Sequence, residues 1–291
     1  MYELHQAGER TYYIDCPAKI GIYVNGGSAY LIDSGNDKDA GKKALKILTE
    51  HEWQLAGILN THSNADHIGG NSFLQQKTSC KIFSGGIEAA FTEHPILEPS
   101  FLYGGYPFGE LRHKFLMAQE SAVSGFSDGE FPREIEIIPL KGHFFDMVGF
   151  RTPDDVVFLA DCLSSRETLD KYKIGFIYDV AEYLKTLETV KGMKAKMFVP
   201  SHAPAAEDIS ELAQYNIDAV NAVADRIVSL CAEPICFEVL LQRLFSEYGL
   251  KMSFEQYVLV GSTVRSYLAW LKDGGRLEGF FEDNMLLWRK I

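Results

Sequence analysis

The chain has 291 residues, a length that predicts one large domain and one small domain. Its formal charge of −12 at pH 7 argues against binding to nucleic acid or an anionic membrane, because such binding depends on lysine and arginine. The five cysteines lack paired spacing, and no apolar stretch approaches the ~18–20 residues of a membrane span. These features predict a cytoplasmic protein. A small-molecule substrate is expected for it.

The first 83 residues alternate between apolar runs of strand length and segments with helical spacing. Strands are predicted over 12–15, 20–24, 29–32, 55–59 and 80–83, and helices over 37–51 and 68–76. Asn25-Gly26-Gly27 is typical of a tight turn between strands. An antiparallel start followed by strand–helix–strand alternation predicts an α/β fold with a mixed sheet and helices outside it.

Residues 61–70, T-H-S-N-A-D-H-I-G-G, follow the strand predicted at 55–59 and concentrate potential metal ligands. In an extended segment residues two apart point to the same side, so His62 and Asn64 are expected to face one pocket. Asp66 and His67 fall where the chain turns towards the next element. A metal centre also needs ligands from other loops, because a coordination sphere is filled from several directions.

Residues 84–131 interrupt this alternation with a long insert rich in aromatic residues, glycine and proline. Tyr103, Tyr106 and Arg112 lie in its centre and are candidates for substrate binding, in a lid over 101–114 that offers apolar walls and positive charge. The alternative is that the aromatic residues pack the insert onto the sheet while the basic residues are solvated.

A second set of strands is predicted over 134–140, 147–152, 156–160 and 197–200, with helices over 180–190 and 209–230. His143, Asp161 and His202 each follow one of these strands, which makes them candidate ligands. Asp33 follows the strand at 29–32 and is interpreted either as a carboxylate that braces the site from behind or as an ordinary Asx-turn residue.

Residues 231–291 form the predicted small domain, and residues 1–230 the large one. Helices over 237–248, 253–259 and 262–272 followed by strands over 276–280 and 284–289 predict a winged-helix-like module. This segment has seven Lys/Arg against eight Asp/Glu, which favours an interface or lid-supporting role over DNA binding.

The stretch at 61–70 closely resembles the H-x-H-x-D-H signature of the metallo-β-lactamase superfamily, with Asn64 where the second histidine is usual. The loops of His143, Asp161 and His202 resemble the G-H-T, G-D and G-H loops of that family, and 231–291 resembles a winged-helix segment appended to some of its members. The resemblance implies a four-layer αββα sandwich, with 1–230 as the catalytic domain.

The resemblance also implies two metal positions that share Asp161. The first would be formed by His62, Asn64 and His143, and the second by Asp66, His67 and His202. An amide oxygen is a weaker donor than imidazole, so the first position should be depleted. One or two divalent ions per chain are expected, with zinc preferred and iron or manganese left open.

A metal ion held by such ligands lowers the pKa of bound water to around 7 and supplies hydroxide at neutral pH. The expected activity is hydrolysis of a small ester, thioester, lactone or phosphoester, with Asp66 taking part in catalysis. Asn64 argues against the family's persulfide-oxidising and oxygen-reducing chemistries. The alternative is a metal-binding but catalytically degenerate sensor or scaffold, and a homodimer is left open.

Overall fold

The structure, a computed structural model, describes residues 2–291. Its first sheet has six strands in sequence order: β1 (Glu3–Gln6), β2 (Thr11–Asp15), β3 (Ile20–Asn25), β4 (Ser28–Ile32), β5 (Gln54–Leu59) and β6 (Lys81–Phe83). β1 to β4 pair antiparallel, whereas β4, β5 and β6 pair parallel, which confirms the predicted mixed sheet. Strand β1 was not predicted. Gly26 and Gly27 close the β3–β4 hairpin with φ values of 58° and 86°, which suit a primed two-residue turn.

The second sheet has four strands in the order β10-β9-β8-β7. These are β7 (Glu136–Pro139), β8 (Val148–Arg151), β9 (Val156–Ser164) and β10 (Met197–His202). Aromatic and aliphatic side chains from both sheets, among them Tyr23, Phe83, Phe150 and Phe158, pack between them. The fold is therefore α/β, with two sheets packed face to face.

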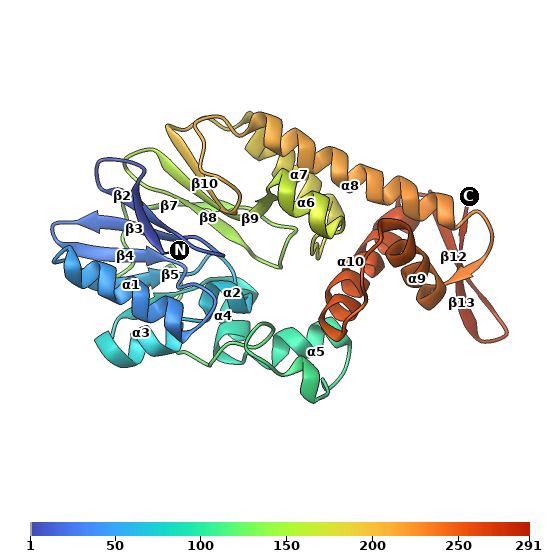
Figure 1. The fold of residues 1–291 in the computed structure, drawn as a ribbon, viewed down its shortest axis with the longest axis horizontal. Helices are drawn as coiled ribbons and strands as arrows, with labels where there is room; N and C mark the ends of the chain where they lie inside the picture. Colours follow the sequence, from blue (N-terminus) through green and yellow to red (C-terminus); the bar gives the residue numbers. More distant parts are fainter. Residues whose placement is uncertain (1) are drawn as a thin grey trace.

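Helices cover the outer faces of both sheets and complete the expected four layers (Figure 1). Helices α1 (Lys38–Glu50) and α3 (Asn71–Thr78) cover the first sheet, and α7 (Val180–Gly192) and α8 (Ser210–Leu230) cover the second. Asp37 begins α1 because its carboxylate accepts hydrogen bonds from the amides of Asp39 and Ala40. No helix within residues 2–291 has the length and apolar content needed to cross a bilayer.

Two local predictions were wrong at the edge of the two sheets that carries the candidate metal ligands. The helix predicted over 68–76 is divided into α2 (Ala65–Ile68) and α3, with Gly69 and Gly70 between them. A Cβ on Gly70 would lie 2.4 Å from the carbonyl oxygen of Ser34, so this close approach requires glycine. Strand β9 continues to Ser164, so Asp161 lies within the strand, directly after Ala160 with its φ of 50°.

The insert at 84–131 is folded and packed, and is not a free loop. It contains α4 (Gly86–Glu93), α5 (Leu97–Tyr103) and the 3₁₀ helix η1 (Gly109–Leu111). Its buried leucines 102, 111 and 116 form a cluster with Val258 of the C-terminal module. Lys114 Nζ lies 2.9 Å from Asp37 Oδ2, and His113 Nε2 lies 3.1 Å from Glu255 Oε1. The insert thus bridges the first sheet's helices and the C-terminal module, and its residues His113 and Lys114 are paired with carboxylates and are not simply solvated.

The C-terminal module contains β11 (Ile235–Cys236), α9 (Phe237–Tyr248), α10 (Phe254–Asp273), β12 (Leu277–Glu282) and β13 (Met285–Lys290). Its three strands form a separate sheet in the order β11-β13-β12. The two helices predicted over 253–272 are one helix, α10, because nothing at Gly261 breaks the chain. Leu240, Val264 and Leu271 belong to the same apolar cluster as Val157 and Leu159 of β9, so the module shares a continuous core with the second sheet.

We expect Leu111→Ala to lower the free energy of unfolding by about 2–5 kcal/mol, because it leaves a cavity between the insert and α10. Leu111 is fully buried, whereas Phe115 in the same insert is 61% exposed and provides the control. Denaturant unfolding of Leu111→Ala and Phe115→Ala measures both changes. Equal, small effects of the two substitutions would show that the insert is a loosely attached lid.

Candidate metal centre

Asp33 fixes the loop that follows β5. Its carboxylate accepts hydrogen bonds from the Thr61 amide at 2.8 Å and the Thr61 hydroxyl at 2.7 Å, and it lies 2.8 Å from His67 Nδ1. Asp33 sits at the end of β4 in a left-handed conformation, with φ of 61°. The Thr61 hydroxyl, having donated to Asp33, accepts from His62 Nδ1 at 2.9 Å. The Nδ1 atoms of both histidines are therefore occupied, which leaves each Nε2 free to act as a ligand.

Four side chains that could hold a metal ion converge beside this loop. Their ligand atoms all lie within 4.8 Å of one another and belong to Asp66, His67, Asp161 and His202. Asp161 Oδ1 is 3.0 Å from His67 Nε2, and Asp161 Oδ2 is 3.1 Å from His202 Nε2. His202 Nδ1 donates to the carbonyl oxygen of Pro17 at 3.0 Å, so its Nε2 also faces the shared space.

A second group, formed by His62, His143 and Asp161, shares the Asp161 carboxylate with the first. Asn64 also reaches this group, but through a hydrogen bond. Its Nδ2 donates to Glu98 Oε1 at 2.8 Å, so its Oδ1 is the acceptor that faces His143 Nε2 at 3.2 Å. His143 Nε2 must then carry a proton, which prevents that nitrogen from binding a metal while the hydrogen bond lasts. For this reason the second group is expected to bind a metal ion more weakly than the first.

Two buried glutamates of the insert support the site and were not predicted. Glu98 holds the Asn64 amide, and Glu88 accepts hydrogen bonds from the Ser63 amide at 3.0 Å, the Ser63 hydroxyl at 2.5 Å and the Asp146 amide at 2.8 Å. Burial raises the pKa of Glu88 to about 7 and that of Glu98 well above its usual value. A weak signal exists in the sequence, since both acids stand in short apolar runs, I-E-A-A-F and L-E-P-S-F.

The carboxylates of the four-residue group favour positive charge on the neighbouring histidines. Burial lowers the pKa of His67, but three nearby carboxylates outweigh burial and raise it well above its ordinary value. These carboxylates belong to Asp161, Asp66 and Asp33. Burial likewise lowers the pKa of His202, yet Asp161 and Asp66 raise it to about 10. In contrast, burial beside His67 lowers the pKa of His62 well below its usual range.

The residues fit a divalent metal ion. His62 Nε2, His67 Nε2 and Asp161 Oδ1 are all buried, and none makes a well-oriented hydrogen bond within residues 2–291, although the last two lie 3.0 Å apart. Buried polar atoms without partners are rare in folded proteins. Neutral imidazole nitrogens and carboxylate oxygens are the ligands that zinc uses in catalytic sites. An ion between these atoms would satisfy them and neutralise the facing carboxylates.

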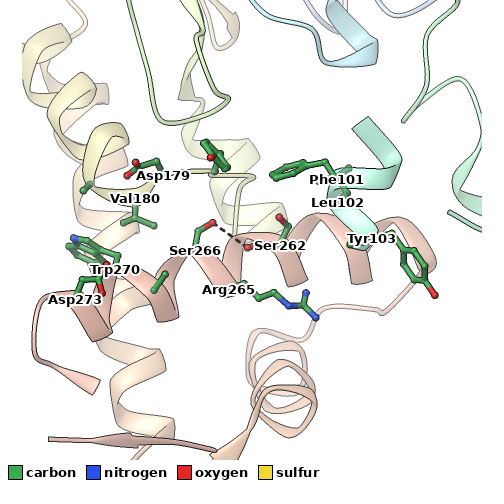
Figure 2. Close-up of a pocket in the computed structure, with 14 residues that line it drawn as sticks. Phe101, Leu102, Tyr103, Asp179, Val180, Ser262, Arg265, Ser266, Trp270 and Asp273 are labelled. Atoms are coloured by element: carbon green, nitrogen blue, oxygen red, sulfur yellow. Dashed lines mark hydrogen bonds between the residues drawn. The ribbon is translucent and has the colours of Figure 1, made fainter. Parts of the chain in front are cut away.

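A wide groove lies outside this cluster. It has a volume of about 860 Å³ and lies between α5, the start of α7 and α10 (Figure 2). Phe101, Tyr103, Asp179 and Ser262 are among its lining residues, but none of the predicted metal ligands is.

The three predicted substrate-binding residues are not brought to the cluster. Tyr103 lines the groove and is 44% exposed. Tyr106 is 73% exposed, and Arg112 donates a hydrogen bond to its hydroxyl at 3.0 Å. No hydrogen bond or ion pair of the described residues joins Tyr106 or Arg112 to the ligand group. These two side chains pair with each other at the surface, and their role in substrate binding stays a prediction.

Comparison with known proteins agrees with this arrangement. Residues 13–202 match the model of the metallo-beta-lactamase superfamily. The chain is 24% identical over 220 residues to a beta-lactamase-like protein 2 homolog of Drosophila melanogaster, covering 70% of this chain and 68% of that protein. It is 23% identical over 201 residues to an atrochrysone carboxyl ACP thioesterase of Aspergillus fumigatus, covering 68% of this chain but only 54% of the thioesterase.

A solved structure extends the similarity to the C-terminal module. A beta-lactamase domain protein from Burkholderia ambifaria has a TM-score of 0.74 and 14% sequence identity, covering 99% of this chain and 94% of that one. Because nearly the whole chain is covered, the fold of residues 231–291 is shared as well as that of the two sheets.

We expect metal binding to release protons, because an ion must displace those held at Nε2 of His67 and His202. The raised pKa values mean that both sites are protonated at pH 7, so apparent affinity should rise with pH through the neutral range and fall in acid. Zinc titration calorimetry in two buffers of different ionisation heat should report roughly two protons released per ion. Release near zero at pH 7 would contradict protonation of this group.

We expect metal content to distinguish the two groups after stripping and reloading with zinc. Wild type should bind about one ion per chain, His202→Ala should lose it, and Asn64→His should gain a second, because imidazole is a better ligand than an amide. His51→Ala, remote from the site, is the control. Full retention in His202→Ala together with an unchanged ratio in Asn64→His would overturn the assignment of strong and weak positions.

Proposed function

Because the chain belongs to the metallo-beta-lactamase superfamily, we propose that it is a metal-dependent hydrolase acting on a small ester or thioester. The observation that supports this most directly is the convergence of Asp66, His67, Asp161 and His202 within 4.8 Å. The similarity to a protein named as a thioesterase favours thioesters among the carbonyl substrates.

We assign the ion, most suitably zinc, to this four-residue group, with His62 and His143 forming the weaker position. When bound, such an ion activates water as a nucleophile and polarises a carbonyl oxygen. Asp33 orients His67 through Nδ1, and the Pro17 carbonyl does the same for His202. Both imidazole rings are therefore oriented with Nε2 towards the site in the metal-free protein. This reduces the conformational entropy that the side chains would lose when an ion binds.

Asp66 is proposed to accept the proton of the attacking water. Its side chain is 40% exposed, whereas that of Asp161 is 10% exposed, so Asp66 is the carboxylate that water and substrate can reach. Its Oδ2 lies 3.3 Å from His202 Nε2, whose protonated imidazole keeps this carboxylate ionised in the metal-free protein; an ion that replaced this proton would do the same. Burial raises the pKa of Asp66, but His67 and His202 outweigh burial and lower it.

The charge around the site favours a carbonyl substrate over a phosphoester. Within the described residues, the ion pairs of Asp66 and Asp161 involve only histidines, and no lysine or arginine pairs with either. Phosphoryl oxygens are usually bound by arginine or lysine in addition to metal ions, and neither residue type pairs with the carboxylates here. An uncharged ester or thioester does not need such a cation.

The second candidate is a metal-binding sensor or scaffold without turnover. It is favoured by one observation, the hydrogen bond from His143 Nε2 to Asn64 Oδ1, which withdraws one histidine from the metal. Turnover distinguishes the two candidates, because a scaffold needs only the bound ion.

We expect zinc-loaded protein to hydrolyse members of a panel of short-chain thioesters and esters, and EDTA to abolish this activity. Asp161→Asn should reduce kcat/KM by at least about 100-fold, since it removes the charge shared by both groups while keeping the shape. His51→Ala is the matched control for loss of an unrelated histidine. Metal-loaded wild type that hydrolyses none of the panel would favour the scaffold.

A further inference from the structure

A small, partly open cavity adjoins the candidate metal centre on the side of the second sheet's helices. It has a volume of about 50 Å³ and is bordered by His143 and Asp161. Its apolar wall is formed by Leu169, Ile174, Phe176, Ile177, Val220 and Val223. The cavity therefore connects two residues of the candidate site to an apolar space, where part of a substrate could be shielded from water.

Two tyrosines in the cavity wall have no hydrogen-bond partner. Tyr183 of α7 is 5% exposed and Tyr267 of α10 is 1% exposed. None of the hydrogen bonds within residues 2–291 involves either phenol oxygen. Unlike the hydroxyl of Tyr23, neither oxygen is fully enclosed by other atoms, and we assign the surface that each retains to the cavity that both residues line. Burial raises the pKa of both phenols, and each remains an O–H donor at neutral pH.

Both tyrosines are held in place relative to the metal ligands. Gly142, next to His143, has φ of 114°, and a Cβ there would lie 2.1 Å from the Tyr183 amide nitrogen. The start of α7 thus packs directly on the loop that carries His143. On α10, the Thr263 hydroxyl accepts a hydrogen bond from the Ile177 amide at 3.0 Å, one turn from Tyr267. Two unpartnered donors are therefore fixed in the wall beside the site.

We propose that this cavity binds the acyl group of the substrate, and that Tyr183 and Tyr267 donate hydrogen bonds to an uncharged oxygen on that group. The inference rests on the proposed hydrolase function and adds a substrate class to it: short acyl groups that carry a hydroxyl or keto oxygen. A buried hydroxyl without a partner is costly, and such an oxygen supplies the missing acceptor.

The size and charge of the cavity define this class. One water needs about 10–15 Å³ of such space, so the cavity accommodates roughly four heavy atoms beyond the reacting carbonyl. Among the described residues, the wall contains no arginine and one lysine, so a carboxylate on the acyl group would be poorly compensated there. The lysine is Lys173, whose ammonium lies 3.5 Å from Asp170 Oδ1. An uncharged polar acyl group fits better than an acidic or a long apolar one.

Tyr267 also gives the C-terminal module a role. It is the module's only residue in the cavity wall, and α10 positions it. Residues 231–291 would then share in selecting the acyl group with Tyr183 and the apolar wall, which belong to the same part of the chain as the candidate metal ligands.

The first test compares two thioesters of N-acetylcysteamine, butanoyl and 3-hydroxybutanoyl, with zinc-loaded protein. Wild type should prefer the 3-hydroxybutanoyl thioester, mainly through a lower KM. Tyr183→Phe and Tyr267→Phe should each reduce this preference by roughly two- to tenfold, the effect of one neutral hydrogen bond. Tyr23→Phe removes a buried, unpartnered hydroxyl elsewhere and should leave the ratio unchanged.

The second test needs no turnover and measures NMR-detected binding of butanamide and 3-hydroxybutanamide. The hydroxylated amide should bind more tightly to wild type, and each phenylalanine variant should reduce the difference. If this holds while no thioester is hydrolysed, the hydrolase proposal fails and the cavity assignment stands. No preference in wild type, or a preference that survives in both variants, overturns the assignment. A lowered melting temperature with unchanged preference also overturns it, because the phenols would then hold structural water.

Discussion

One carboxylate, that of Asp161, organises the edge of the sandwich where the ligands meet. Its two oxygens lie 3.0 Å from His67 Nε2, 3.1 Å from His202 Nε2 and 3.7 Å from His143 Nε2. These histidines come from three separate segments, so burying the aspartate among them requires both sheets to align. The left-handed conformation of Ala160 turns β9 just before this residue. A negative charge at this depth needs compensation, and the surrounding imidazoles, or an ion that replaces their protons, provide it.

The insert contributes to the same site from behind. Glu88 and Glu98 are buried, and each holds one residue of the loop between His62 and Asp66. Asn64 precedes α2 but does not cap it, because its amide bridges Glu98 and His143 instead. The asparagine that departs from the family signature is thus part of a hydrogen-bonded chain. This chain stabilises the loop and would at the same time compete with a metal ion for His143.

The sequence was sufficient for features that depend on local spacing. The helix at 37–51, the Gly26-Gly27 turn and the strands that precede the ligands follow from periodicity and turn chemistry, and the structure places them within a few residues of the prediction. The prediction was wrong where distant segments meet. Glu88 and Glu98 gain their roles only from partners that folding brings close, and no spacing within α4 or α5 reveals them. The break at Gly69-Gly70 likewise results from contact with the Ser34 carbonyl.

The core shared between the second sheet and residues 231–291 affects how the protein can assemble during synthesis. Helix α8 contributes Val220 and Ile227 to the same apolar cluster as Tyr267 and Leu271 of α10. Domains generally fold in the order in which they leave the ribosome. Here the two sheets can form early, but one side of α8 stays uncovered until α10 emerges. The wall beside His143 is therefore among the last parts of the molecule to close, and in a nascent chain the candidate ligands can come together before that wall is complete.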